Sequence, residues 1–330
     1  MISIALLGAG RIGQIHGSNI AIGGGGARLA AIADPVPEAA ATLAAHTGAP
    51  VRGVEEIFGD ASIDAVVIAT PTDTHADFIH RAADAGKAIF CEKPVDLSAA
   101  RIRETLARVE KAGVPLMIGF NRRFDPNFAA LRKRLADDMA GDVELVTILS
   151  RDPAPPPVSY IERSGGLFRD MMIHDFDMAR FLLGEEIVEV QAMGSALVDR
   201  AIGAAGDVDT AAVILKTASG KICQISNSRR ATYGYDQRIE VHGSKGMLSA
   251  GNVHETTVRF AGAAGISADP VQNFFLERYA AAYRDELRAF IGMLEKGSAP
   301  SPSGHDGLQA QILADAATEA CFSGRPVRIG

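Results

Sequence analysis

Three ionisable side chains lie in two separate stretches of the sequence, at positions that suit acid–base chemistry. Lys93 belongs to a Glu-Lys-Pro sequence that directly follows a short apolar run typical of a strand. Asp170 and His174 are four residues apart in a stretch predicted to be helical over 167–183, and Asp177 follows three residues later. The i, i+4, i+7 spacing predicts one shared helix face. On that face Asp170 can orient the His174 imidazole as a proton acceptor.

Other interpretations of these residues stay open at this point. Lys93 by itself is also what an exposed lysine at a strand end looks like. The pair Asp170 and His174 could be a solvated surface contact or part of a zinc or manganese site. Because no second histidine or cysteine cluster stands nearby to complete such a site, we predict no metal.

A glycine-rich sequence near the N-terminus indicates dinucleotide binding. Gly8–Gly13 lies between an apolar strand and a helix, where Gly8 permits a tight turn, Gly10 a close approach to a pyrophosphate, and Gly13 close helix packing. Asp34, at the end of the next strand, can accept hydrogen bonds from ribose hydroxyls. No arginine or lysine follows closely to receive a 2′-phosphate, so NAD is predicted over NADP. The alternative is a helix-opening glycine turn that binds no nucleotide.

The elements that must position these residues alternate over the first 120 positions. Predicted strands cover 2–7, 28–33, 64–69, 87–91 and 116–120. Predicted helices run from the glycine motif to about 22, and then over 37–47, 75–85 and 99–112, the last with Ser98 as its N-cap. Predicted loops cover 23–26 and 70–74, and the second loop also supplies an N-cap. This alternation predicts an α/β fold: an N-terminal Rossmann domain, 1–120, with a doubly wound parallel sheet. Ligands bind outside the carboxyl ends of such strands.

The pattern changes after residue 120. Predicted helices cover 126–138, 167–183, 273–296 and 304–322, and predicted strands cover 143–150, 187–197, 209–216, 221–226, 237–242, 254–260 and 326–329. Consecutive strands with hairpin-length turns predict a C-terminal α+β domain, 121–330, built on an open, mostly antiparallel sheet.

Composition excludes several classes of protein. The net charge is −7, with no block of basic residues, so nucleic-acid binding is not expected. No apolar run has the length of a membrane span, and the N-terminus lacks the positive region of a signal peptide. The three cysteines, Cys91, Cys223 and Cys321, are scattered and lack metal-ligand spacing, which favours a reducing cytoplasm.

Taken together, the motifs resemble those of the Gfo/Idh/MocA family of nicotinamide-dependent sugar and cyclitol oxidoreductases. The resemblance covers the whole chain and rests on GAGRIG at 8–13, ATPTxxH at 69–75, EKP at 92–94, GFNRRFD at 119–125 and GGxFxDMMIHDxD at 165–177. It implies a Rossmann domain followed by a domain whose open sheet covers the nicotinamide and forms the interface of a homo-oligomer, a tetramer or dimer.

The resemblance also implies roles for individual residues. Lys93, Asp170 and His174 would be catalytic. The dinucleotide would be contacted by Gly8, Gly10, Arg11, Ile12, Gly13, Asp34, Thr70, Thr72, His75, Glu92 and Lys93. The polyol would be contacted by Lys93, Arg123, Asp152, Asp170, His174, Asp177 and either Tyr233 or Tyr235.

The reaction implied is NAD-dependent oxidation of a secondary hydroxyl of a cyclitol, myo-inositol to its 2-keto product. Oxidation of scyllo-inositol, or of an aldose at C1, is the alternative within the class. A regulator that binds NAD without turnover is the alternative from another class, although a pure binder has no need of Lys93, Asp170 and His174.

Overall fold

The computed structural model describes residues 1–22 and 26–330, and they form two compact units. The first unit comprises Met1–Phe124 and Ala282–Gln311, and the second comprises Asp125–Ala281 and Ile312–Gly330. The sequence indicated two consecutive domains divided after residue 120. It gave no sign that the chain returns to the first unit at Ala282. Most of the predicted loop over 23–26 lies outside the described residues.

The first unit contains a five-stranded parallel sheet, as predicted. Its strands are β1 (Ile2–Leu7), β2 (Ala27–Ala33), β3 (Ala65–Ile68), β4 (Ala88–Glu92) and β5 (Leu116–Gly119), in the spatial order β2-β1-β3-β4-β5. They are mostly apolar because helices cover the sheet on both faces, and Ser3, Arg28 and Glu92 are the exceptions. Every residue of β3 and β5 is buried.

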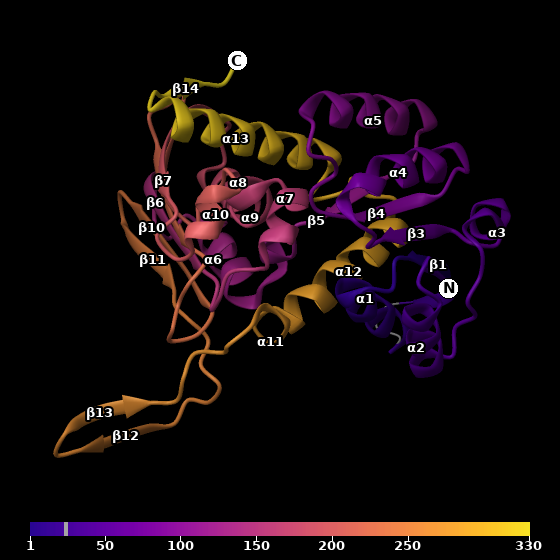
Figure 1. Ribbon diagram of the computed structural model, residues 1–330, viewed down its shortest axis with the longest axis horizontal. Helices are drawn as coiled ribbons and strands as arrows, with labels where there is room; N and C mark the ends of the chain where they lie inside the picture. The colour runs from indigo at the N-terminus through magenta and orange to yellow at the C-terminus, as the bar shows by residue number, and fades with distance from the viewer. Residues whose placement is uncertain (23–25) are drawn as a thin grey trace. The chain divides into compact units, whose positions relative to one another are not determined.

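Helices cover the two faces of this sheet (Figure 1). They are α1 (Arg11–Ala21), α2 (Pro37–Thr47), α3 (Val54–Gly59), α4 (His75–Asp84), α5 (Ala99–Ala112), most of α12 (Ala280–Lys296) and the start of α13 (Gly304–Ser323), with short 3₁₀ turns η1 (Thr72–Thr74) and η2 (Asn121–Phe124). Figure 1 shows α4 and α5 on one face and α1 and α2 on the other. Leu287 and Phe290 of α12 pack in the same core cluster as Ile4, Leu6 and Phe90.

Two local predictions in this unit had different outcomes. Ser98 is confirmed as the N-cap of α5, where its hydroxyl accepts a hydrogen bond from the Arg101 amide at 3.4 Å. The loop over 70–74 supplies the N-cap residue of α4, Thr74, as predicted, but the Thr74 side chain makes no capping hydrogen bond to the helix. The Thr74 hydroxyl donates within the loop, to Thr70 Oγ1 and the Pro71 carbonyl, each at 2.7 Å.

The second unit contains a seven-stranded, mostly antiparallel sheet, as predicted. Its strands are β6 (Val143–Arg151), β7 (Ile187–Ser195), β8 (Thr210–Thr217), β9 (Ile222–Ser228), β10 (Asp236–Gly243), β11 (Gly246–Ala250) and β14 (Val327–Arg328), in the order β11-β10-β6-β9-β8-β7-β14. The central pair β6 and β9 is parallel and its neighbours are antiparallel. Buried and exposed residues alternate along β8 and β10, so one face packs on a core and the other faces outward.

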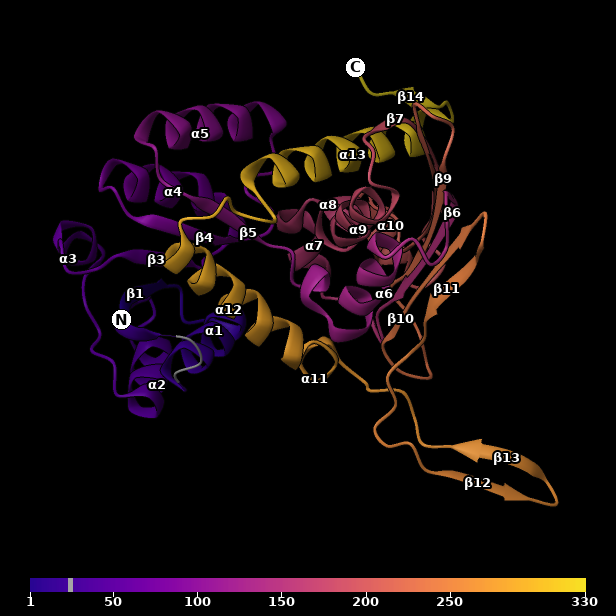
Figure 2. The same cartoon turned by 180° about the vertical axis from the view of Figure 1, so that it is seen from behind.

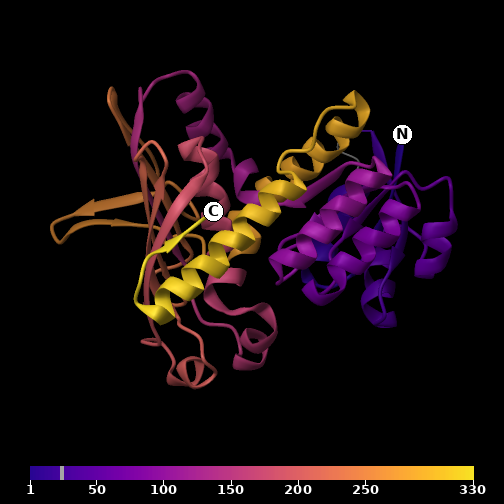
Figure 3. The ribbon, with the colours of Figure 1, turned by 90° about the horizontal axis from the view of Figure 1, so that it is seen from above.

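The helices of the second unit lie on the buried face of the sheet (Figure 3). They are α6 (Pro126–Ala136), α7 (Val158–Ser164), α8 (Gly166–Asp170), α9 (Ile173–Leu183), α10 (Arg200–Ala204), α11 (Phe275–Arg278) and the end of α13. A separate hairpin of β12 (Arg259–Gly262) and β13 (Gly265–Ala268) extends away from the rest of this unit (Figure 2).

Three elements predicted for the C-terminal part of the chain were wrong in extent. The helix predicted over 167–183 is two helices, α8 and α9, separated at Met171 and Met172. The helix predicted over 273–296 is divided at Tyr279 into α11 and α12. The strand predicted over 254–260 begins only at Arg259, because its partner is the unpredicted β13. Within the described part of the chain, no helix is both long and apolar enough to cross a membrane.

Candidate active site

The predicted cofactor residues of the first unit lie at the carboxyl ends of neighbouring parallel strands. The glycine loop follows β1, Asp34 follows β2, Thr70 follows β3, and Lys93 follows β4. Because these strands are adjacent and parallel, the loops gather at one edge of the sheet. The strand order reverses between β1 and β3: the strand after β1 lies on one side of this pair, and the strands after β3 lie on the other. Doubly wound folds bind their ligands at such a switch point.

The glycine loop has the form of a phosphate cradle. A Cβ on Gly13 would lie 2.0 Å from the Gly8 carbonyl oxygen, and a Cβ on Gly8 would lie 2.5 Å from the Ala69 carbonyl oxygen. A Cβ on Gly10 would meet no atom within 4 Å. The turn is therefore tightly packed at Gly8 and Gly13 but open at Gly10. No side chain caps the N-terminus of α1. Helix N-terminal amides left in this way bind phosphate, so these residues fit a dinucleotide.

Asp34 fastens this loop to the second strand. One carboxylate oxygen accepts the Ala9 amide at 2.5 Å, and the other accepts the Val36 amide at 2.7 Å. A carboxylate has about four lone-pair positions, so it can also accept hydrogen bonds from ribose hydroxyls. Its negative charge opposes a 2′-phosphate, which agrees with the predicted preference for NAD.

His75 joins two of the loops at this edge. It is 1% exposed, with Nδ1 2.7 Å from the Pro94 carbonyl and Nε2 2.8 Å from the Thr70 carbonyl. Burial lowers the pKa of His75, which favours the neutral ring. The His75 ring thus connects the loops that contain Thr70 and Lys93. Thr72, which follows Thr70 in the sequence, is half-buried in the turn η1.

The other predicted residues of this unit lie at the end of β4, in η2 and just after the glycine loop. Lys93 and Glu92 are half-buried at the end of β4. Arg123, in η2, has a guanidinium 2.9 Å from the Asp306 carboxylate. Asp306 also accepts the Ser303 amide at 2.7 Å, so this ion pair is fixed to the start of α13. Arg11 is exposed and Ile12 half-buried, directly after the cradle.

In the second unit, Asp170 and His174 lie on two different helices, so the predicted shared helix face was wrong. Asp170 is the last residue of α8, and His174 is the second residue of α9. The amides of Met171 and Met172 both bond to the Leu167 carbonyl, at 3.0 and 2.9 Å, which ends α8 tightly. The turn keeps the two residues close in the chain without placing them on one helical face.

A buried arginine links two of the predicted carboxylates. Arg229 lies just after β9, with guanidinium nitrogens 3.4 Å from Asp170 and 3.8 Å from Asp152. Arg229 is 2% exposed. The Tyr160 hydroxyl donates to the other oxygen of Asp170 at 3.1 Å. The carboxylate of Asp170 is therefore held from two sides.

Arg229 was missed by the sequence analysis, although the sheet explains its position. Parallel pairing aligns Arg151 of β6 with Ser228 of β9, and the Asp152 amide bonds to the Ser228 carbonyl at 3.0 Å. Asp152 and Arg229 are the next residues on the two strands. Only the register between distant strands brings them together, so no local signal could have identified the arginine.

The remaining predicted polyol residues differ in exposure. Asp177 is fully buried on α9, and Tyr235 is 6% exposed. Tyr233 is 47% exposed, and its hydroxyl donates to Asp236 at 2.6 Å and accepts from Arg151 at 3.0 Å. Tyr233 therefore offers the accessible ring of the two tyrosines.

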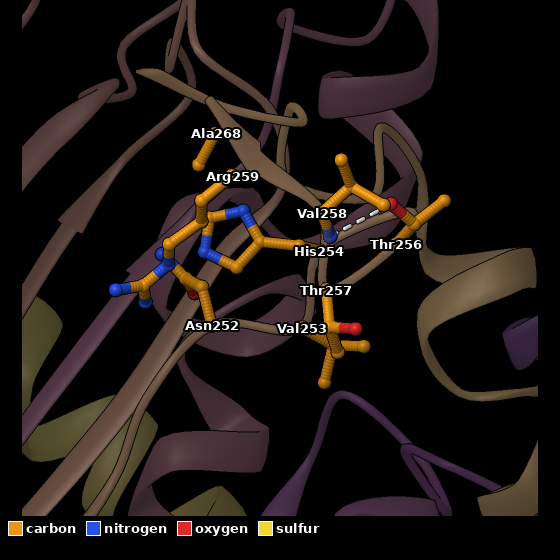
Figure 4. Close-up of a pocket in the computed structure, with 8 residues that line it drawn as sticks. All are labelled: Asn252, Val253, His254, Thr256, Thr257, Val258, Arg259 and Ala268. Atoms are coloured by element: carbon orange, nitrogen blue, oxygen red, sulfur yellow. Dashed lines mark hydrogen bonds between the residues drawn. The ribbon is translucent and has the colours of Figure 1, made fainter. Parts of the chain in front are cut away.

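A surface pocket of about 310 Å³ lies beside hairpin β12–β13 in the second unit (Figure 4). It is lined by Asn252, Val253, His254, Thr256, Thr257, Val258, Arg259 and Ala268. The His254 Nδ1 atom is 2.7 Å from the Asp269 carbonyl, and the Val258 amide donates to Thr256 Oγ1 at 3.1 Å. None of the predicted site residues lines this pocket.

Comparisons with known proteins cover both units of the chain. Residues 2–120 match an oxidoreductase family described by its NAD-binding Rossmann fold, and residues 128–249 match the GFO/IDH/MocA C-terminal domain. The chain is 56% identical to inositol 2-dehydrogenase of Rhizobium meliloti over 99% of both chains. It is 45% identical to myo-inositol 2-dehydrogenase of Thermotoga maritima, covering 99% of this chain and 98% of that protein.

A solved structure adds a bound state for comparison. Scyllo-inositol dehydrogenase of Lactobacillus casei, with bound NAD(H) and scyllo-inositol, matches with a TM-score of 0.92 at 31% identity over 99% of both chains. The matches to the family extend over both units. On this evidence the chain belongs to the Gfo/Idh/MocA family of oxidoreductases, with an NAD-binding Rossmann domain at its N-terminus.

Proposed function

We propose that this chain is an NAD-dependent inositol 2-dehydrogenase that oxidises a secondary hydroxyl of myo-inositol to the ketone. The observation that supports it most is the similarity to the Rhizobium meliloti inositol 2-dehydrogenase, 56% identical over 99% of both chains. The glycine cradle and Asp34 support the cofactor half of the proposal, because they fit a dinucleotide without a 2′-phosphate.

The chemistry assigns separate tasks to the residues of the chain. NAD, when bound, supplies the acceptor for the hydride. His174 takes the hydroxyl proton, and Asp170 stabilises the charged imidazolium that results. Lys93 donates a hydrogen bond to the same hydroxyl oxygen and stabilises the negative charge that develops on it. Arg229 acts through Asp170, as a positioning residue.

The proposal also assigns residues that bind the rest of the polyol. Arg123, Asp152, Asp177 and one of the two tyrosines bind the remaining hydroxyls. The exposure of Tyr233 favours it over Tyr235. A ring of polar side chains distinguishes inositol stereoisomers because an unmatched hydroxyl leaves a buried polar group without its hydrogen bond.

A substrate panel tests the reaction. Purified protein is incubated with NAD⁺ or NADP⁺ and with myo-inositol, scyllo-inositol or D-glucose, and the reduced cofactor is followed by absorbance. We expect turnover with myo-inositol and NAD⁺. Faster turnover of scyllo-inositol or glucose would reassign the substrate, and cofactor binding without turnover of any polyol would favour a regulator.

We also propose that the chain forms a homo-oligomer in the cytoplasm, using the outward face of the second-unit sheet. Met193, Ile214, Ile222 and Met247 are all at least 39% exposed on its strands. Large apolar side chains exposed on the outward face of a sheet favour association. The cysteines are free, which suits a reducing compartment. Analytical ultracentrifugation tests this, with Met193→Lys expected to weaken the assembly.

A further inference from the structure

A cluster of three ionisable side chains lies inside the first unit, and the mechanism above does not use it as a cluster. It consists of His16 on α1, Glu92 at the end of β4, and Glu286 on α12, whose nearest nitrogen and oxygen atoms all lie within 4.8 Å of one another. His16 and Glu286 are 0% exposed, and the Glu92 side chain is 12% exposed. Nothing in the sequence pattern connected these three positions.

His16 and Glu92 form the hydrogen-bonded part of the cluster. The Nε2 atom of His16 lies 2.6 Å from the Glu92 carboxylate. The rings of Phe90 and Tyr283 pack edge-on against the imidazole, at centroid distances of 5.1 and 5.8 Å. His16 Nδ1 is buried without a hydrogen-bond partner among the described residues, so the neutral ring with its proton on Nε2 suits this site.

Glu286 is the unusual member. Both of its carboxyl oxygens are buried, and neither accepts a hydrogen bond from a donor among the residues described. Burial, together with the negative charge of Glu92, raises the pKa of Glu286 well above its ordinary value. Two ionised carboxylates beside a neutral imidazole would leave two like charges buried in one place, which a folded protein avoids.

The cluster could in principle hold a metal ion, but its geometry favours a proton. Two atoms that bind one zinc ion at about 2.0–2.2 Å lie about 3 Å or more apart. The His16 and Glu92 atoms are 2.6 Å apart, which is a charge-assisted hydrogen-bond distance. An ion between them would require both side chains to move. Glycine at position 119 leaves room for the Glu92 carboxylate where it is, since a Cβ there would lie 3.0 Å from Glu92 Oε2.

We propose that Glu286 is a neutral carboxylic acid in the folded protein, and that its proton and the His16 N–H together fix the Glu92 carboxylate and hence the loop of Lys93. Glu92 and Lys93 are consecutive residues at the edge where the cradle lies, so an altered Glu92 side chain moves the lysine that follows it. Glu286 is a positioning residue in this account. The consequence for activity rests on the proposed function, whereas the protonation of Glu286 does not.

The first test uses stability and needs no substrate. Glu286→Gln keeps the shape, donor and acceptor of the neutral acid but cannot ionise. Glu110→Gln, at an exposed position on α5, is the matched control. A carboxyl group with a raised pKa in the folded state makes folding take up a proton, so wild-type stability falls as pH rises above 4.5, the ordinary pKa of this group.

We therefore expect the melting temperature of E286Q, relative to wild type, to rise steadily from about pH 5 to about pH 9. The E110Q difference should stay flat over the same range. If the E286Q difference is instead as flat with pH as the E110Q difference, Glu286 is ionised in the folded protein and the proposal is overturned.

The second test observes the proton directly. Infrared spectroscopy of wild-type protein at neutral pH should show the carbonyl stretch of a protonated carboxyl group, absent from E286Q and present in E110Q. A stoichiometric metal in the wild-type protein that is lost in E286Q would overturn the proposal in favour of a metal site.

The third test connects the cluster to catalysis. Glu286→Leu matches the side chain in size but can neither donate nor accept a hydrogen bond. We expect kcat/KM of E286Q to exceed that of E286L by about tenfold. Equal values would show that Glu286 does not position the Lys93 loop. If the protein turns over no polyol at all, the proposed function fails, while the stability and infrared results still decide the state of Glu286.

Discussion

The guanidinium of Arg229 lies 3.4 Å from the carboxylate of Asp170, and the arginine is 2% exposed. This ion pair constrains the direction of the carboxylate, because removing the arginine would leave the largely buried charge of Asp170 without its guanidinium partner. The residue proposed to stabilise the His174 imidazolium is thus itself held by a residue from the neighbouring sheet. The sheet register, and not only the α8–α9 turn, therefore sets the position of the Asp170 carboxylate.

Replacing Arg229 should reduce turnover without abolishing cofactor binding. We expect Arg229→Met to lower kcat by roughly 10- to 100-fold, because a small misplacement of a catalytic group has effects of that size. KM for NAD⁺ should stay near the wild-type value. Arg229→Lys restores the charge but not the planar fork, and should recover part of the loss. Steady-state kinetics measure both, and an unchanged kcat in R229M would contradict the role of Arg229.

Asp34 should set the choice of cofactor. Asp34→Ser removes the charge that opposes a 2′-phosphate, together with acceptors for the Ala9 and Val36 amides. We expect the ratio of kcat/KM for NAD⁺ to that for NADP⁺ to fall about tenfold or more. Initial rates with each cofactor give this ratio. A ratio equal to that of wild type would mean that Asp34 does not meet the ribose.

Two glycines of the cradle should respond differently to the same substitution. Gly10→Ala places a methyl group where no atom lies within 4 Å, so the protein should fold normally and bind NAD⁺ more weakly. Gly13→Ala places a methyl group 2.0 Å from the Gly8 carbonyl oxygen, and should lower stability by about 2 kcal/mol or more. Chemical denaturation without cofactor and NAD⁺ titration separate the two effects. Equal loss of stability in both variants would contradict the cradle geometry.

Gly166 should matter for the catalytic pair through its contact with Asp207. Its φ is +82°, and a Cβ there would lie 2.6 Å from the Asp207 carboxylate, which accepts the Leu167 amide at 3.0 Å. Gly184 has a similar φ of +66° but no atom within 4 Å of its Cβ position. Gly184→Ala should therefore cost only the backbone strain, about 1 kcal/mol.

Gly166→Ala should cost more, and it should also lower kcat by displacing α8 and Asp170. Thermal melts and kinetics on the two variants measure this difference. If G184A loses as much stability and activity as G166A, the Asp207 contact has no part in placing α8.

Much of the fold follows from local sequence. The apolar runs that became β1, β3 and β5 are bounded by glycine, proline or polar residues, so their positions could be predicted closely. Helix α2 was predicted with its observed bounds, Pro37–Thr47, since proline opens it and Gly48 ends it in the left-handed conformation.

The errors share one physical origin, which is contact between distant residues. The break between α8 and α9 falls at Met171 and Met172, where no glycine or proline marks it. Two residues that contact Asp170 in space, Tyr160 and Arg229, belong to other elements. The cluster of His16, Glu92 and Glu286 likewise joins three elements that only the folded sheet brings together.

The central claim is that Lys93 and His174 act on one hydroxyl group of the substrate, and a double-mutant cycle on turnover tests it most directly. Rates of NADH formation from myo-inositol are measured for wild type, Lys93→Met, His174→Gln and the double variant under saturating NAD⁺. Groups that act together on one proton give strongly non-additive losses, so the double variant should be about as slow as the slower single variant. If the two losses simply multiply, or if either single variant turns over at the wild-type rate, the account is wrong.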